Sequence, residues 1–124
     1  MSWGDAEATC RSLSSHLASI HSAEENEFIY VLMGKIHNHT TGESYWIGGH
    51  DIFKEGDYMW TDGSKWDYAT FGYGQPDNLG GENYIGSWYP DNDHITWNDY
   101  PASYSFPFVC KYQLRNRICC DSGY

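Results

Sequence analysis

Basic side chains are scarce in this sequence. Lys and Arg number 7 against 17 Asp and Glu, so the formal net charge at pH 7 is -10. A protein that binds nucleic acid needs a basic surface to neutralise phosphates, and we therefore expect no nucleic-acid partner. The negative charge is compatible with binding a cation, and equally with a role in solubility alone.

Long apolar runs are also missing. No segment approaches the ~20 apolar residues that a membrane-spanning helix needs, so we expect no membrane insertion. There is no signal peptide either, and we expect the printed chain to represent a mature form. The sequence contains neither GxSxG nor HExxH, which predicts that the protein is not an enzyme. Spacing alone does not decide whether a Ser, a His and an Asp meet in space.

Cysteine is limited to 4 residues, and none forms a CxxC pair. A zinc ribbon or a thioredoxin-type site is therefore not expected. Cys10 and Cys110 lie near opposite ends and predict a disulfide that closes nearly the whole domain, which in the chain-entropy model stabilises it by about 4–5 kcal/mol. Asn38 begins the glycosylation sequon NHT, and together with the cysteines this favours a secreted glycoprotein.

Aromatic residues, in contrast, are abundant. They make up 18% of the 124 residues, with 6 Trp and 11 Tyr, and the apolar fraction of 40% is enough for a core. This length suits one compact domain. Because Trp and Tyr carry a polar atom, we expect an aromatic, partly hydrated core in which those atoms have partners.

Two helices are predicted near the N-terminus. The first covers 2–17 and starts at the N-cap Ser2. Its apolar face follows a spacing of four, three and four residues and consists of Ala6, Cys10, Leu13 and Leu17. The second helix opens at Ser22, which forms a capping box with Glu25, and is predicted to end at Gly34.

Short strands are predicted in the rest of the chain. A hairpin arm over 55–64 contains a turn at Asp62 and Gly63. From Ser64 to Gly81 no regular pattern is visible, and such a long irregular stretch in a compact domain is usually functional. Further strands are predicted at 45–49, 83–88, 94–99 and 106–112. Two helices followed by short strands around a long loop define an α+β domain.

Oxygen-bearing side chains gather in this irregular stretch and on the strand over 94–99. Ca²⁺ prefers ~6–8 oxygen ligands from carboxylates, amides and carbonyls in a flexible geometry. The side chains that offer such a set are Gln75, Asp77, Glu82, Asn98 and Asp99. The sequence therefore predicts a calcium site shared between the loop and the strand, with a solvated polar loop as the alternative.

Several motifs, read in order, resemble the C-type lectin family. They are YWIGG at 45–49, QPDN at 75–78, GEN at 81–83, WND at 97–99 and FVCKY at 108–112, preceded by a similar two-helix opening. The resemblance implies a double-loop α+β fold over residues 1–113, in which the long loop binds Ca²⁺. It leaves 114–124 as a C-terminal tail.

The resemblance also implies a ligand. In the family the principal calcium site binds the sugar through two neighbouring hydroxyls, and its positions fall here on Gln75, Asp77, Glu82, Asn98 and Asp99. The order Gln-Pro-Asp at 75–77 is typical of members that bind galactose or N-acetylgalactosamine. Many of these have a stacking Trp where this chain has Leu79. Trp88 and Tyr89 are the predicted aromatic contacts instead, with Tyr73 as a further candidate and a core position as the equal alternative for Trp88.

A possible second calcium site follows from the same resemblance. Its positions are Asp51, Glu55, Asn78, Glu82 and Asn83. Asn78 and Asn83 are neutral, and fewer charges weaken a Ca²⁺ site. A polar turn is the alternative role for Asp51 and Glu55.

The chain departs from the family at three places. A second disulfide is missing, because its positions hold Tyr84 and Ala102, so the loop is expected to depend more on bound Ca²⁺. The family's N-terminal strands are missing too, and we expect either that the sequence is truncated at its start or that another segment covers the edge of the last strand. Cys119 and Cys120 in the tail are not expected to bond to each other, and their expected partners are a missing N-terminal cysteine or another chain. An interchain bridge would give a disulfide-linked dimer with higher avidity for clustered glycans.

The expected function is calcium-dependent binding of galactose-type glycans on cell or microbial surfaces, in keeping with a role in host defence. The alternative is a non-sugar module on the same fold that binds a protein or ice, because fold does not fix function. The complete set of calcium ligands favours the first of these.

Overall fold

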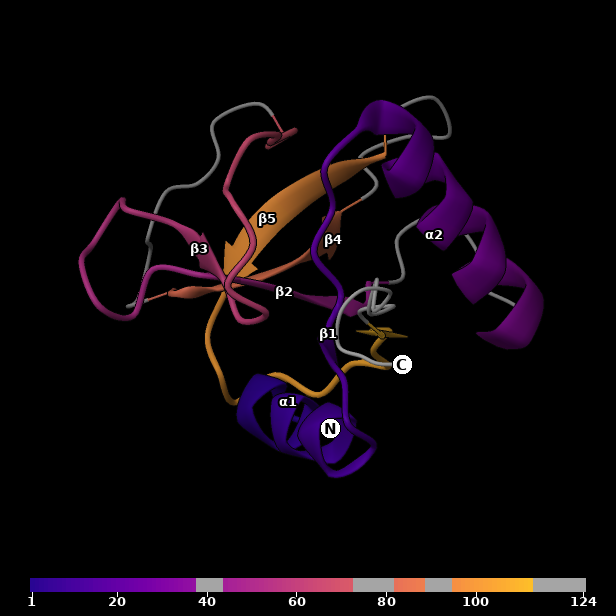
Figure 1. The fold of residues 1–124 in the computed structure, drawn as a ribbon, viewed down its shortest axis with the longest axis horizontal. Helices are drawn as coiled ribbons and strands as arrows, with labels where there is room; N and C mark the ends of the chain where they lie inside the picture. Colours follow the sequence, from indigo (N-terminus) through magenta and orange to yellow (C-terminus); the bar gives the residue numbers. More distant parts are fainter. Residues whose placement is uncertain (38–43, 73–81, 89–94, 113–124) are drawn as a thin grey trace, which may run out of the picture.

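The computed structural model describes residues 1–37, 44–72, 82–88 and 95–112. Within this part of the chain, helices and short strands form the predicted α+β architecture (Figure 1). The elements are α1 (Trp3–Ser12), β1 (His16–Leu17), α2 (Ala23–His37), β2 (Trp46–His50), β3 (Met59–Trp60), β4 (Tyr84–Trp88), β5 (Thr96–Tyr100) and β6 (Cys110–Lys111).

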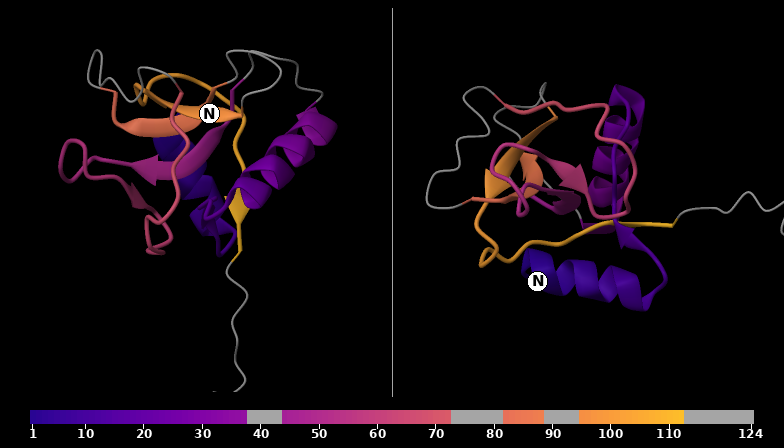
Figure 2. Two further views of the ribbon diagram at one scale, coloured as in Figure 1. Left: turned by 90° about the horizontal axis from the view of Figure 1, so that it is seen from above. Right: turned by 60° about the vertical axis from the view of Figure 1, so that its left-hand side comes forward.

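The strands form two antiparallel groups. β3, β2, β4 and β5 make one sheet in this order, and β1 pairs with β6. The two helices lie on different sides of the strands, and Figure 2 shows them at a steep angle to each other. A strand overlaps each predicted region, but the last one covers only Cys110–Lys111 of the predicted 106–112. The predicted turn is present, with Gly63 N donating to Trp60 O at 3.1 Å and a φ of 81° at Gly63.

Helix α1 begins as predicted and ends earlier than predicted. The Ser2 hydroxyl accepts a hydrogen bond from Asp5 N at 3.3 Å, which caps the first turn. The helix stops at Ser12, because Ser14 adopts a left-handed conformation with φ of 60° and Ser15 N bonds back to Cys10 O at 2.9 Å. The prediction of a helix through Leu17 was thus wrong.

The shorter helix changes the predicted apolar face. Leu13 is 54% exposed, whereas Leu17 is fully buried as part of β1. His16 and Leu17 pair with Lys111 and Cys110 of β6. A segment predicted to be helical thus lies along one side of the last strand.

Helix α2 starts at the predicted cap and continues past its predicted end. Glu25 N donates to Ser22 Oγ at 3.0 Å, while Glu25 Oε1 accepts from His21 N at 2.8 Å. The helix runs through Gly34 to His37. A glycine ends a helix where it takes a positive φ, and among the described glycines this holds only for Gly56 and Gly63. Gly34 is therefore an ordinary helical residue, at a cost of about 1 kcal/mol relative to Ala.

The core is aromatic, as expected, and most of its indole nitrogens have partners. Trp3 Nε1 donates to Ile47 O at 2.9 Å, and Trp97 Nε1 donates to Asn26 Oδ1 at 3.1 Å. A disulfide joins Cys10 of α1 to Cys110 of β6 across 100 residues, which is the pairing that the sequence predicted. At the positions of the missing second disulfide, the Tyr84 ring packs on Trp3 with centroids 4.6 Å apart.

None of the helices in the described part of the chain is long and apolar enough to cross a bilayer.

Candidate calcium and sugar site

The structure describes part of the predicted site. Glu82, Asn98, Asp99 and Trp88 belong to the described residues, as do Asp51, Glu55 and Asn83 of the possible second site. Predictions for the following residues lie outside the described ranges: Asn38, Tyr73, Gln75, Asp77, Asn78, Leu79, Tyr89, Cys119 and Cys120.

The β4–β5 ladder brings the described members of the principal site to one end of the sheet. Ile85 pairs with Asp99, and Tyr84, the first residue of β4, pairs with Tyr100, the last of β5. Glu82 lies two residues before β4. Because the strands run antiparallel, its position is next to the end of β5 that carries Asn98 and Asp99.

Asn98 carries the most informative atom of this region. Its side-chain Oδ1 is one of six buried polar side-chain atoms of the described residues that have no hydrogen-bond partner, and it is the one among them that belongs to a predicted calcium ligand. Buried polar atoms in folded proteins are nearly always paired, so an unpaired amide oxygen calls for an explanation. An amide oxygen is a ligand that Ca²⁺ accepts, and a bound cation would satisfy it.

Tyr100 connects Asn98 and Glu82 electrostatically. Its hydroxyl donates to Ser87 O at 3.0 Å and lies 3.1 Å from Ser44 Oγ. Burial raises the pKa of Tyr100, hydrogen bonds from the side chains of Ser44 and Asn98 oppose this, and the negative charge of Glu82 adds to it. The Asn98 amide therefore lies against the Tyr100 hydroxyl, and the Glu82 carboxylate is within electrostatic reach of β5.

Asp51, Glu55 and Asn83 of the possible second site also lie close together. Asp51 is buried, accepts from Gly56 N at 2.9 Å, and its own N donates to Asn83 O at 3.1 Å. With its amide nitrogen turned toward these acceptors, Asn83 donates to Asp51 Oδ1 at 3.1 Å. These hydrogen bonds connect the segment that follows β2 to the residues that precede β4.

Glu55 is the exposed carboxylate of this group. Its pKa is raised, first by desolvation, then by its hydrogen bond to Asp51 and by the negative charges of Asp51 and Asp99. Three carboxylates thus influence one another at this end of the sheet. A proton on Glu55 or a bound cation would relieve the repulsion. No group of three or more His, Cys, Asp or Glu arranged to hold a metal occurs among the described residues, so a cation here would also need ligands from outside them.

Trp88, at the end of β4, packs against the backbone of Gly72. A Cβ atom on Gly72 would lie 2.3 Å from Cζ3 and 2.4 Å from Cε3 of the indole. The ring is nevertheless partly exposed. Neither Gly72 nor this contact was singled out from the sequence, because it joins positions that are distant in the chain.

A second polar cluster, which sequence reasoning missed, brings a Ser, a His and two Asp side chains together. His21 Nδ1 lies 2.7 Å from Asp67 Oδ1, and His21 Nε2 lies 3.0 Å from Ser64 Oγ. The Ser64 hydroxyl donates to Asp62 Oδ1 at 2.5 Å, so its proton is directed to a carboxylate and away from the histidine. A serine nucleophile needs the opposite arrangement, in which the histidine accepts that proton.

The same cluster holds Asp62 as a carboxylate. Burial would raise the pKa of Asp62, but hydrogen bonds from Ser19 and Ser64 outweigh it and lower the pKa. The hydrogen bond from His21 lowers the pKa of Asp67. The cluster is therefore a network of mutually satisfied groups.

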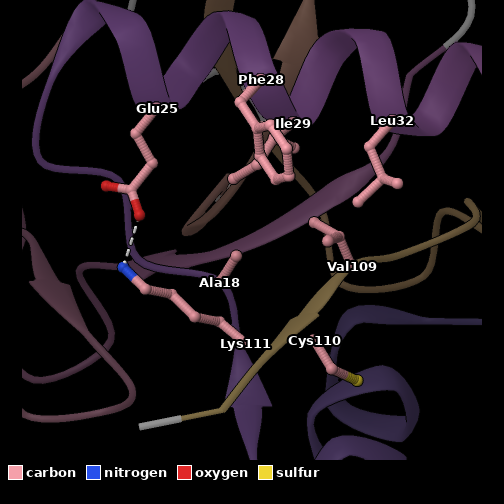
Figure 3. A pocket seen from close by; sticks show the side chains of 8 residues that line it. All are labelled: Ala18, Glu25, Phe28, Ile29, Leu32, Val109, Cys110 and Lys111. Carbon is pink, nitrogen blue, oxygen red and sulfur yellow. Dashed lines mark hydrogen bonds and ion pairs between the residues drawn. The ribbon is translucent and has the colours of Figure 1, made fainter. Parts of the chain in front are cut away.

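A groove of about 240 Å³ lies between α2 and β6, away from the predicted calcium ligands (Figure 3). Its wall is mainly apolar, and one end is formed by the ion pair of Glu25 Oε2 and Lys111 Nζ at 2.7 Å. The lining residues are Ala18, Glu25, Phe28, Ile29, Leu32, Val109, Cys110 and Lys111. None of them belongs to the predicted calcium or sugar site, so this groove is not the site in question.

Comparison with known proteins places the chain in a family. The sequence matches the family described as "Lectin C-type domain" over residues 1–112. This chain belongs to the C-type lectin domain family. The family was the one that the motifs resembled, and its members are lectins rather than enzymes, in agreement with the prediction that this domain is not an enzyme.

Two relatives and one solved structure illustrate the relationship. A protein named "Lectin" from Pleurodeles waltl is 40% identical over 116 residues, which cover 90% of this chain and 64% of the relative. An "Alpha-N-acetylgalactosamine-specific lectin" from Patiria pectinifera is 35% identical over 118 residues, covering 92% of this chain and 70% of the relative. This C-type lectin domain thus spans about two thirds of the length of these relatives.

The C-type lectin CEL-I from Cucumaria echinata has the same fold, with a TM-score of 0.81 and 33% identity over 89% of this chain and 81% of that one. The double-loop α+β fold predicted from the motifs is therefore confirmed. Similar structures also include herring type II antifreeze protein and a calcium-independent type II antifreeze protein. Members of this fold consequently differ in what they bind.

Proposed function

We propose that this domain binds carbohydrate through a loop-bound Ca²⁺ and prefers galactose or N-acetylgalactosamine. The observation that carries the proposal is the buried, unpaired Oδ1 of Asn98, next to the buried Asp99 and near Glu82. These residues fit a hard cation, because they offer amide and carboxylate oxygens at one end of a sheet. Gln75 and Asp77 are proposed to complete the site.

In this proposal the ion, when bound, supplies two coordination positions for neighbouring sugar hydroxyls. The protein side chains orient the sugar. Carboxylates of Asp77 and Glu82 accept hydrogen bonds from the hydroxyls, and the amides of Gln75 and Asn98 donate to them. Tyr100 supports this role, since its hydroxyl lies against the Asn98 amide and thereby leaves Oδ1 for the cation.

The galactose-type preference rests on the order of amide and acid at 75–77. That order decides which pair of hydroxyls finds a matching acceptor and donor. The relationship to a lectin from Patiria pectinifera that is named as specific for α-N-acetylgalactosamine supports the same class of sugar. Tyr89 is proposed as an aromatic contact to the apolar face of the sugar.

A second Ca²⁺ is proposed near Asp51 and Glu55, with Asn78, Glu82 and Asn83 as further ligands. The supporting observations are the contacts between Asp51 and Asn83, with Asn83 donating to Asp51 Oδ1 at 3.1 Å and Asp51 N donating to Asn83 O at 3.1 Å, and the raised pKa of the nearby Glu55. A proton on Glu55 is the competing way to balance the negative charge of this region.

The proposal also covers the localisation, the glycosylation and the partners of the protein. We propose a secreted protein with its lectin domain at 1–113, glycosylation at Asn38, and galactose-type glycans on cell or microbial surfaces as partners, in keeping with host defence. Cys119 and Cys120 of the tail 114–124 are proposed to link two chains.

The second candidate function is a non-sugar interaction module that binds a protein or ice. The similarity to type II antifreeze proteins, one of them calcium-independent, favours it to a small extent. A module that does not bind calcium would have no use for an unpaired oxygen at Asn98. It would also have little reason to keep the full set of calcium ligands, so both features argue for the first function.

Affinity chromatography tests the proposal. The full chain should be retained on immobilised galactose with millimolar Ca²⁺ and released by EDTA, and it should pass through a mannose column. The double variant Gln75→Glu/Asp77→Asn should shift retention toward mannose. Flow-through of the wild type on both columns would favour the non-sugar module, and retention on mannose alone would contradict the galactose preference.

A further inference from the structure

Trp88 packs so closely on Gly72 that a residue with a side chain would not fit at position 72. Gly72 has no positive φ, so its backbone conformation is open to any residue. The restriction is space: a Cβ atom would lie 2.3 Å from the indole ring, which is rigid and unable to yield as the tip of a flexible chain does. Glycine at this position therefore serves the close contact with Trp88.

Both partners of the contact are held by hydrogen bonds to β5. Gly72 N donates to Trp97 O at 3.1 Å, and Trp97 N donates to Thr70 O at 3.0 Å. On the other side, Thr96 Oγ1 donates to Trp88 O at 2.6 Å. The contact thus spans the first residues of β5, and the strand fixes the backbone of both partners.

Helix α2 anchors this part of β5 in turn. Asn26 is buried, accepts from Trp97 Nε1 at 3.1 Å, and donates through Nδ2 to Ile95 O at 2.9 Å. One side chain therefore satisfies both an indole and a backbone carbonyl. Asn98 and Asp99 follow Trp97 directly, so the anchored segment is continuous with two of the proposed calcium ligands.

The contact lies close in the sequence to the proposed calcium ligands. Gly72 lies three residues before Gln75 and five before Asp77, the proposed ligands from the loop, while β5 carries Asn98 and Asp99. The Trp88 ring therefore packs where Gly72 adjoins the strand that bears Asn98 and Asp99.

We propose that Trp88 is a positioning residue for the calcium site, acting through Gly72. Its ring holds the backbone of Gly72 against β5, the strand that carries Asn98 and Asp99. The inference rests on the proposed function, and it gives Trp88 a role different from the sugar contact that the sequence suggested. A sugar platform acts on the bound glycan, whereas a positioning residue acts on the affinity for the ion itself.

Calorimetric titration of the full chain with CaCl₂ in the absence of sugar separates these roles. Gly72→Ala and Trp88→Ala should each weaken Ca²⁺ binding by roughly 10-fold or more, the range known for residues that support metal ligands. The double variant should bind Ca²⁺ no more weakly than Trp88→Ala alone, because removing the ring makes room for the added methyl group. Gly34→Ala, at a glycine with no atom within 4 Å of a Cβ, is the matched control and should leave the affinity unchanged.

Trp88→Phe is the control for a general loss of folding in Trp88→Ala. It keeps an aromatic ring and should retain more Ca²⁺ affinity than Trp88→Ala. Unchanged Ca²⁺ affinity in Gly72→Ala and Trp88→Ala, or weaker sugar binding by Trp88→Ala at saturating Ca²⁺ with normal ion affinity, would overturn this inference alone. A wild-type chain that binds no Ca²⁺ would overturn the proposed function together with it.

Discussion

Two polar regions of this domain differ in how completely their groups are satisfied. In the cluster of His21, Asp62, Ser64 and Asp67, hydrogen bonds pair the side chains with one another, and the pKa values of both aspartates are lowered. At the end of β4 and β5, Asn98 Oδ1 has no partner and the pKa of Glu55 is raised. The first region resembles a catalytic triad in its residue types, yet it is the second region in which a polar atom lacks a hydrogen-bond partner.

This difference has a physical basis. A network whose donors and acceptors match gains its full stabilisation from the protein alone and has nothing left for a ligand. Carboxylates that repel one another beside an unpaired amide oxygen gain stability when a cation arrives. Residue types alone are a poor guide to the site, and the balance of donors, acceptors and charges separates the two regions.

The largest expected effect concerns the unsatisfied region. Millimolar Ca²⁺ should raise the melting temperature of the wild type by roughly 5–10 °C, because binding at 100 times Kd stabilises by about 2.7 kcal/mol. Glu82→Gln should remove most of this rise by taking away a charged ligand. Differential scanning fluorimetry with CaCl₂ and with EDTA measures both.

Asp67→Asn is the control from the satisfied region and should keep the full calcium-dependent rise. An equal melting temperature in CaCl₂ and EDTA for the wild type would contradict the comparison between the regions.

A smaller effect is expected where the satisfied network reaches β6. Lys111 Nζ donates to Ser19 O at 3.0 Å and to Glu25 Oε2 at 2.7 Å. Lys111→Met should lower the free energy of unfolding by about 1–2 kcal/mol, because charged hydrogen bonds are lost while the apolar stem is kept. Urea denaturation measures it, with the exposed Lys65→Met as control. A change in Ca²⁺ affinity in Lys111→Met would mean that the two regions are coupled.

The smallest effect is a pH dependence at Glu55. Its pKa in the folded state is raised above the ordinary 4.5, so the stability it contributes is present below pH 4.5 and is lost as the pH rises through the folded value. In EDTA, Glu55→Gln should therefore unfold at a higher temperature than the wild type at pH 7 and at a similar one at pH 4.

Calcium should reverse this order at pH 7 if the second ion binds, because the variant loses a ligand. Asp57→Asn, at an exposed acid of the same hairpin, is the control. A Glu55→Gln variant less stable than the wild type in EDTA at pH 7 would contradict the repulsion inferred here.

Local patterns in the sequence predicted much of the fold. The caps at Ser2 and Ser22, the turn at Gly63 and the Cys10–Cys110 disulfide are all present. The predicted C-terminal ends of both helices were wrong, each for its own reason. Ser14 takes a left-handed conformation that its residue type does not signal, and Gly34, which commonly marks a helix end, lies inside α2.

The candidate site was predictable in its ligand types and less so in its support. The motif at Trp97 to Asp99 indicated oxygen ligands on a strand, and β5 carries them. The contact of Trp88 with Gly72 and the bond of Asn26 to Trp97 join residues far apart in sequence. Such contacts depend on the packed fold, and no local pattern encodes them.

The aromatic core has one more consequence. The rings of Trp60, Trp66 and Trp97 lie together, with centroid separations of 4.5 Å, 5.5 Å and 5.8 Å, and Trp97 directly precedes Asn98. Indoles at these separations couple their electronic transitions, so the near-ultraviolet circular dichroism of the domain should be strong and sensitive to small rotations of Trp97. The protein thereby contains its own optical reporter beside the proposed ion.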